Sequence, residues 1–307
     1  MKLGTLILAT DYSSGADAAA ERAVAMAKDR QGHLVVLHIS GPKPLFPMEA
    51  EALTASHREL EEVRKLRRAR GSEQLIATVE ALRGRGVEAR GELREGPIVD
   101  AIAGAARELD ADLIITGERG LTGENVFPLG SVAEGVARCA HTNVLVVRGE
   151  PTAEPFRRIL ITTDLTEASK AAIATALAFA APDADVELMH VVEWGDHAPP
   201  IRGPHGSPAV DFKKLWSAAI GEAERELEAL TGRLGSSGAK LRYRIVEGVA
   251  AVDILKHLEG HDHDLVVVGK HADEPPAYAS VSERVVRSAP CSVLVARRRP
   301  GALHAVR

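Results

Sequence analysis

Hydrophobic residues along the chain fall into short continuous runs, separated by longer stretches in which apolar positions recur with helical spacing. In the first half the runs cover residues 3–10, 33–39, 87–93, 112–116 and 143–148. Such runs predict buried strands of a parallel sheet. The stretches between them predict helices at 15–30, about 50–83, 97–109 and 131–140. Strands that alternate with helices predict an α/β fold whose sheet is covered on both faces.

The same order of elements occurs twice, with an offset of about 152 residues. Two segments of the first half match two of the second, pairing 6–11 with 159–164 and 112–117 with 264–269. An offset of this length indicates two similar domains rather than a solenoid. We therefore expect one domain at residues 1–150 and another at 155–299.

The loop after the fourth predicted strand has the spacing Gly-x2-Gly-x9-Gly-Ser. Its members are Gly117, Gly120, Gly130 and Ser131, and a helical pattern begins at Val132. Glycine lets a backbone approach an anion closely, and free N–H groups at a helix start point toward it. In an open parallel sheet, ligands bind at the carboxyl ends of strands where the winding reverses. Because Asp11 ends the first strand, we expect a carboxylate and an anion-binding loop on two sides of one crevice.

At these residues the chain resembles the universal stress protein family in its tandem two-domain form, and the resemblance extends over both halves. It implies two tandem, open, doubly wound parallel sheets of the adenine-nucleotide alpha hydrolase type, with strand order 3-2-1-4-5. It also implies a site for ATP in the first domain, with AMP or ADP as alternatives and Mg²⁺ held through the phosphates.

The resemblance also assigns roles to individual residues of the first domain. Asp11 would meet the nucleoside end of the nucleotide, and Ile39 would contact the adenine ring. Arg119 would reach a phosphate, although the resemblance fixes no residue type there. The residues expected around the ribose and phosphates are Gly117, Gly120, Gly130, Ser131 and Val132.

Several of these residues also have a purely structural explanation. Asp11 can cap the helix that follows it, Gly117 can turn the chain after a strand, and Gly130 can open a helix. His38 and His190 are more typical of packed histidines at strand ends than of catalytic groups. The sequence therefore assigns no catalytic residue.

The leading hypothesis is a cytoplasmic stress-response protein that binds ATP and acts through partners. The chain has no Gly-x4-Gly-Lys-Ser/Thr loop, which argues against an ordinary P-loop motor. Two alternatives stay open. One is an enzyme that uses an adenylate site, through adenylation or slow ATP hydrolysis with Glu118 or Glu124 orienting water. The other is a scaffold that does not depend on nucleotide.

The second half departs from the loop pattern. Gly269 is retained, but Ala272 replaces the second glycine, and Ala279 with Ser280 replaces the Gly-Ser pair. Two acidic residues and two prolines occupy 273–276. The acidic groups repel phosphate, and the prolines remove backbone donors. We expect the second domain not to bind ATP in this way.

Two other features of the second half have no assigned role. The Pro/Gly/His-rich segment 195–210 is interpreted as a loop, either a lid, a partner surface or a mobile connection. The second feature is a histidine cluster, in which His257 and His261 have helical spacing, and His263 lies between Asp262 and Asp264. Because Gly260 is expected to end the helix, the sequence favours no metal site there.

Composition limits the partners and the compartment. The net charge of −5 gives no electrostatic footprint for nucleic acid. No apolar window reaches the length of a membrane span, and two cysteines make no disulfide framework, so we expect a cytoplasmic protein.

Both fifth strands, near 143–147 and 292–296, are apolar sheet edges, which predicts pairing of the two domains within the chain. Homodimerisation stays open.

Overall fold

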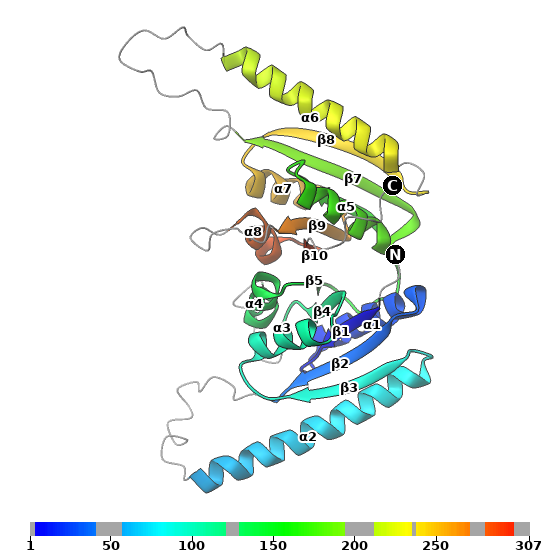
Figure 1. The fold of residues 1–307 in the computed structure, drawn as a ribbon, viewed down its shortest axis with the longest axis vertical. Helices are drawn as coiled ribbons and strands as arrows, with labels where there is room; N and C mark the ends of the chain where they lie inside the picture. Colours follow the sequence, from blue (N-terminus) through cyan, green and yellow to red (C-terminus); the bar gives the residue numbers. More distant parts are fainter. Residues whose placement is uncertain are drawn as a thin grey trace, which may run out of the picture. The chain divides into compact units, whose positions relative to one another are not determined.

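The computed structural model describes residues 4–40, 57–120, 129–193, 212–234, 238–270 and 280–297. The chain divides into two compact units, Met1–Glu154 and Pro155–Arg307. The first runs from blue to green in Figure 1 and the second from green to red. No helix in the described ranges is both long enough and apolar enough to cross a membrane.

The first unit alternates strands and helices from its first strand to its last. Its elements are β1 (Thr5–Ala9), α1 (Ser14–Arg30), β2 (His33–Ile39), α2 (His57–Gly84), β3 (Ala89–Arg94), α3 (Ile98–Glu108), β4 (Leu113–Gly117), α4 (Ser131–Cys139) and β5 (Asn143–Val147). The sheet has the order β3-β2-β1-β4-β5, and neighbouring strands run parallel. The predicted fold class and strand order are confirmed.

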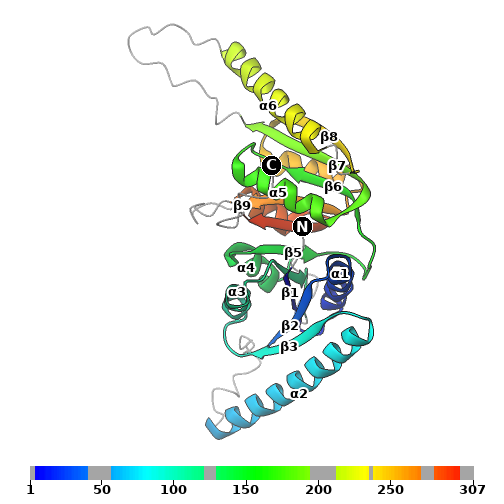
Figure 2. The same cartoon turned by 45° about the vertical axis from the view of Figure 1, so that its right-hand side comes forward.

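Packing explains why these segments form this sheet. β4 and β5 are buried along their whole length, whereas the edge strand β3 carries exposed and half-buried polar residues. Five alanines of α1 are buried, so that helix lies close against the sheet beside β4. Helices α3 and α4 pack together on the opposite face, as Figure 2 shows. The part of the second predicted helix before His57 lies outside the described residues.

The second unit repeats the arrangement. Its elements are β6 (Phe156–Thr162), α5 (Glu167–Phe179), β7 (Ala180–Glu193), α6 (Phe212–Leu234), β8 (Lys240–Gly248), α7 (Ala250–Glu259), β9 (Leu265–Lys270), α8 (Val281–Ser288) and β10 (Ser292–Arg297). The sheet order β8-β7-β6-β9-β10 is again 3-2-1-4-5 when the strands are counted within the unit. The predicted loop 195–210 lies outside the described residues.

Candidate functional site

The winding of the first sheet reverses between β1 and β4. Strand β1 pairs with β2 on one side and with β4 on the other, where Leu8 stands opposite Ile115. Asp11 and Glu118 each come three residues after those paired positions. The chain segments that leave both strands therefore start side by side at the carboxyl edge of the sheet, which is where open α/β sheets bind ligands.

The corner between β1 and α1 is organised around Asp11 and Ser13. Tyr12 adopts a left-handed backbone conformation with φ of 63°, and this turns the chain sharply into the helix. The hydroxyl of Ser13 accepts a hydrogen bond from the N–H of Ala16, so Ser13 is the N-cap of α1. The same hydroxyl donates to Oδ1 of Asp11 at 2.6 Å. Asp11 therefore supports the capping residue and is not itself the cap.

Two glycines let the loop after β4 come into direct contact with this corner. A Cβ atom on Gly117 would overlap the carbonyl oxygen of Gly15 in the first turn of α1. A Cβ atom on Gly120 would overlap Oδ2 of Asp11. The loop and the carboxylate thus meet at van der Waals distance, and both glycines are required by close approach rather than by an unusual φ.

The far end of the loop returns to the same place. The N–H of Gly130 donates to the carbonyl oxygen of Glu118 at 2.8 Å, which closes the loop. Gly130 is the N-cap of α4 and makes no side-chain capping hydrogen bond. Ser131 is exposed and Val132 half-buried at the helix start. The first backbone N–H groups of a helix have no partner within the helix, so this terminus presents donors and a positive dipole end.

The two charged residues of the loop differ in their partners. Arg148, the residue that follows β5, forms an ion pair with Glu118 at 3.1 Å. The side chain of Arg148 is 8% exposed. The Nε atom of Arg119 is buried and makes no hydrogen bond with any described residue. A buried guanidinium nitrogen without an acceptor is costly, so an anionic ligand is the kind of partner that suits it. Glu124 lies outside the described residues.

Ile39 ends β2, the strand beside β1, and is half-buried. Next to it, Nδ1 of His38 donates to the carbonyl oxygen of Thr10 at 2.9 Å. The centres of the Tyr12 and His38 rings are 4.7 Å apart. The hydroxyl of Tyr12 donates to the carbonyl oxygen of Gly71 on α2. His38 thus serves to hold the end of β1, as expected for a packed histidine.

The structure brings most of the predicted site residues together. Asp11 meets Gly120, Gly117 meets the first turn of α1, and Gly130 closes onto Glu118. Ile39 lies at the same sheet edge, at the end of the next strand. A separate hollow lined by Thr5, His33, Arg83 and Arg90 lies at the opposite, amino ends of the strands.

The second unit copies the corner but differs at the start of the helix that follows β9. Leu165 has a φ of 64°, Thr166 caps α5 and donates to Asp164 at 2.6 Å, and His190 donates to Thr163. The helix after β9 differs, because the hydroxyl of Ser280 accepts from the N–H of Glu283 and so caps α8 itself. The altered loop positions, 272–279, lie outside the described residues.

Comparison with known proteins gives the family. Residues 3–148 and 155–297 each match the Universal stress protein family. The chain belongs to that family. A universal stress protein of Methanocaldococcus jannaschii is 31% identical over 143 residues, which are 47% of this chain and 81% of the relative. One from Bacillus subtilis is 28% identical over 144 residues, which are 47% of this chain and 97% of the relative.

The fold comparison covers both units of this universal stress family chain. A solved universal stress protein from Archaeoglobus fulgidus has a TM-score of 0.68 and 18% identity, with 97% of each chain covered. A Pseudomonas aeruginosa protein described as functionally unknown has a TM-score of 0.60 and 17% identity, with 96% of this chain and 92% of that one covered. At these identities the likeness establishes the tandem fold alone.

Three groups were not predicted from the sequence to belong to the site, although Ser13 or Ser14 was expected to cap the first helix, and Ser13 does so. Gly15 allows the first turn of α1 to lie against the loop, Ser13 holds Asp11, and Arg148 holds Glu118. Gly15 and Ser13 belong to the sequence Asp-Tyr-Ser-Ser-Gly, which begins two residues after the end of β1. A small residue at the start of an alanine-rich helix is the signal that would have indicated close packing there.

Proposed function

We propose that the first unit binds an adenine nucleotide, ATP by expectation, and that the protein is a cytoplasmic stress-response protein regulated by that nucleotide. The observation that carries the proposal is the start of α4. Its cap residue Gly130 has no side chain that could accept hydrogen bonds from the first N–H groups of the helix. A helix start of this kind is a binding site for phosphate.

The loop supplies the rest of a phosphate site. Gly117 lets the loop lie directly against the first turn of α1, and Gly120 lets it lie directly against Asp11. Arg119 carries a positive charge and a buried nitrogen that makes no hydrogen bond with described residues. In the proposed complex the N–H groups of Ser131 and Val132 donate to phosphate oxygens, and Arg119 pairs with the phosphate charge.

In the proposed complex, the nucleoside end of the nucleotide contacts residues at the ends of neighbouring strands. Asp11 on the β1 side accepts hydrogen bonds from the nucleoside, and Ile39 at the end of β2 offers an apolar contact to the adenine ring. Within the described residues, one cluster of Glu and His side chains could hold a metal ion, and it lies in the second unit. In the proposed complex Mg²⁺ binds through the phosphates and water, as Mg²⁺ commonly does beside nucleotides.

Hydrolysis is not part of the leading proposal. Glu118 was the described candidate for orienting water, but its carboxylate is paired with Arg148 at 3.1 Å. The ion pair engages this carboxylate with Arg148, so the proposal gives Glu118 no part in orienting water. The proposal is therefore binding and regulation, with partners to be identified.

Calorimetric titration of the full chain with ATP and Mg²⁺ tests the proposal. We expect one binding event per chain, with affinity falling from ATP to ADP to AMP because each phosphate removed loses contacts to the loop. The double variant Gly130→Glu with Ser131→Ala places a negative charge at the helix start and should abolish the heat. Ser280→Ala, at the equivalent helix of the second unit, is the matched control and should leave it unchanged.

Two results would reject this reading. If adenine nucleotides at millimolar concentration give no heat and no thermal shift, the proposal that the first unit binds them is wrong. Two equal sites per chain, or a site that survives the double variant, removes the assignment to the first unit. Multiple-turnover ATP consumption above that of a Gly117→Ala, Gly130→Glu variant would favour the enzyme alternative instead.

A further inference from the structure

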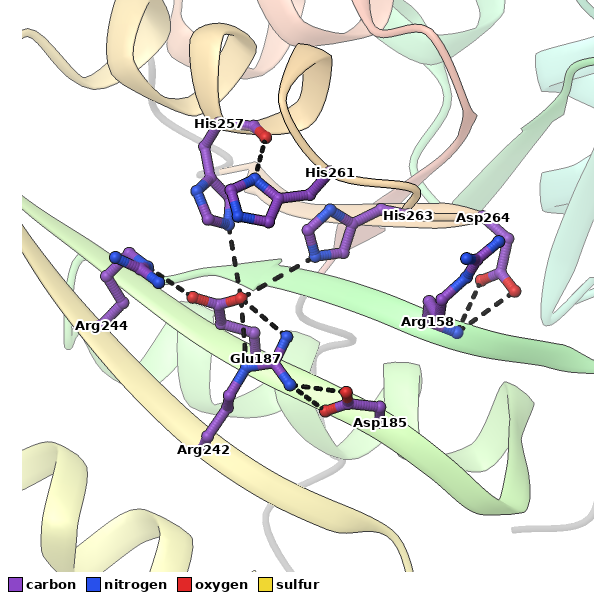
Figure 3. A network of polar contacts seen from close by, with 9 residues as sticks. All are labelled: Arg158, Asp185, Glu187, Arg242, Arg244, His257, His261, His263 and Asp264. Atoms are coloured by element: carbon purple, nitrogen blue, oxygen red, sulfur yellow. Dashed lines mark hydrogen bonds and ion pairs between the residues drawn. The ribbon is translucent and has the colours of Figure 1, made fainter.

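The second unit contains a buried group of side chains that the proposed nucleotide site does not use. Glu187 lies on β7, His257 on α7, and His263 in the loop between α7 and β9 (Figure 3). Oε2 of Glu187 is 3.3 Å from Nε2 of His257 and 3.9 Å from Nε2 of His263. The three side chains are 2%, 8% and 4% exposed, respectively. Two imidazoles therefore face one oxygen of a buried carboxylate.

We propose that Glu187, His257 and His263 bind a divalent transition-metal ion, with Zn²⁺ as the expected ion. Two imidazole nitrogens and one carboxylate oxygen form a donor set that zinc binds, with a fourth position left for water. In a tetrahedral site with bonds of about 2.0 Å, ligand atoms are about 3.3 Å apart. One ligand atom of each residue lies within 4.8 Å of the others, so small side-chain movements suffice.

His263 provides an independent reason to expect a ligand. Its side chain is almost fully buried, yet its Nδ1 has no hydrogen-bond partner among the described residues, and its Nε2 is too far from Glu187 for a hydrogen bond. Buried polar groups are nearly always paired, and one that is not calls for a missing water or ion. A metal ion between Nε2 and the carboxylate gives Nε2 the close partner that the described residues do not provide, and the ring proton then lies on Nδ1.

The protonation states of the group are those that a metal requires. Burial lowers the pKa of both His257 and His263, so both rings are neutral at physiological pH. Burial opposes ionisation of Glu187, but hydrogen bonds from Arg244 and Arg242 outweigh it and hold its pKa at about 2. Neutral imidazole and ionised carboxylate are the ligand forms, so no proton has to be removed from an imidazolium or carboxylic acid before binding.

Two arginines also contact the carboxylate, and their geometry is compatible with a metal. Nε of Arg244 donates to Oε1 at 2.6 Å, and Nη2 of Arg242 donates to Oε2 at 3.1 Å. Arg242 also pairs with Asp185, which balances its charge. Nε of Arg242 lies 3.3 Å from the same Oε2. Each carboxylate oxygen has about two lone-pair positions, so Oε2 can accept from this one guanidinium and still bind a metal. The arginines would then orient the ligand, as hydrogen-bond donors around metal sites do.

The sequence favoured no metal site at the histidine cluster, and the proposed ligands include only part of that cluster. Nδ1 of His261 donates to the carbonyl oxygen of His257, and its side chain is outside the three-residue group. Asp264 accepts from the backbone N–H groups of Arg157 and Arg158, so that carboxylate is engaged elsewhere. Glu187 is missing from the local pattern because it lies 70 residues before His257. The proposed site thus depends on the pairing of strands rather than on a sequence motif.

The experiment is zinc binding by the full chain. The protein is treated with a chelator, dialysed, incubated with Zn²⁺ alone and freed of excess metal before its zinc content is measured by mass spectrometry. We expect one zinc per chain and a higher midpoint of thermal unfolding with zinc, because a ligand that binds the folded state stabilises it. Co²⁺ in place of Zn²⁺ should give the visible absorption bands of a tetrahedral site.

Matched histidine variants separate the site from surface binding. His263→Gln should lose the zinc and the thermal shift; it removes no side-chain hydrogen bond, so the apo variant should fold like the wild type. His261→Gln, two residues away and exposed, should keep both. Wild-type protein that retains no zinc overturns the proposal, and so does equal zinc retention by the His263→Gln variant. Because ATP binding is tested separately, failure here leaves the proposed function unaffected.

Discussion

The carboxylate of Asp11 occupies the space that a Cβ atom on Gly120 would need. Gly120→Ala must therefore displace either the carboxylate or the loop, and overpacking of this kind costs about 1–3 kcal/mol. We expect the variant to bind ATP at least tenfold more weakly in a calorimetric titration. Gly104→Ala, on α3 with its nearest neighbour at 3.9 Å, is the control and should leave affinity unchanged. Equal affinities in both variants would contradict the close contact.

The glycines that end β4 and β9 should respond differently to the same change. A Cβ atom on Gly117 would overlap the carbonyl oxygen of Gly15, and backbone cannot move aside as a flexible side chain can. A Cβ atom on Gly269 would lie 3.7 Å from Cα of Ser169, an ordinary contact. Gly117→Ala should lower the free energy of unfolding by about 1–3 kcal/mol, and Gly269→Ala by much less. Urea unfolding of the two variants measures the difference.

The serines at the starts of α4 and α8 should separate stability from binding. Ser280 caps α8 with its hydroxyl, so Ser280→Ala should cost about 1 kcal/mol of stability without changing ATP affinity. Ser131 is exposed and follows the cap of α4, so Ser131→Ala should cost little stability. Under the proposed function that second variant weakens ATP binding. Thermal unfolding and calorimetry on both proteins provide the check, and reversed effects would contradict the assignment of the two helix starts.

The structure confirms the predicted alternation of strands and helices in both units. It also confirms the strand order that the resemblance implies. The reason is physical, since runs such as Leu113–Gly117 are apolar on both sides and can only be central strands. The contact between Gly120 and Asp11 could not be foreseen, because it depends on how two distant loops meet. Glu187 was missed for the same reason, although a glutamate within an apolar strand is a signal that such a carboxylate has buried partners.

Tyr12 makes the stability of the first unit depend on alkaline pH. Burial raises the pKa of its hydroxyl from its ordinary value of 10 to about 12. Between these values the unfolded chain loses the proton and the folded chain keeps it, so stability is complete below pH 10 and falls as pH rises toward 12. A shift of this size corresponds to at most about 3 kcal/mol.

The Tyr12→Phe variant isolates this contribution. At neutral pH it should be less stable by about 1 kcal/mol, since it loses the hydrogen bond to the carbonyl oxygen of Gly71. The deficit should shrink and then reverse as pH rises above 10 toward 12, because the variant has no hydroxyl to ionise at that position. Tyr243→Phe, at a side chain that is 40% exposed, should keep the alkaline loss of the wild type because Tyr12 remains. Urea unfolding across this pH range measures the difference in free energy of unfolding between the variant and the wild type. A difference that stays constant with pH would mean that Tyr12 ionises equally in the folded and unfolded chain.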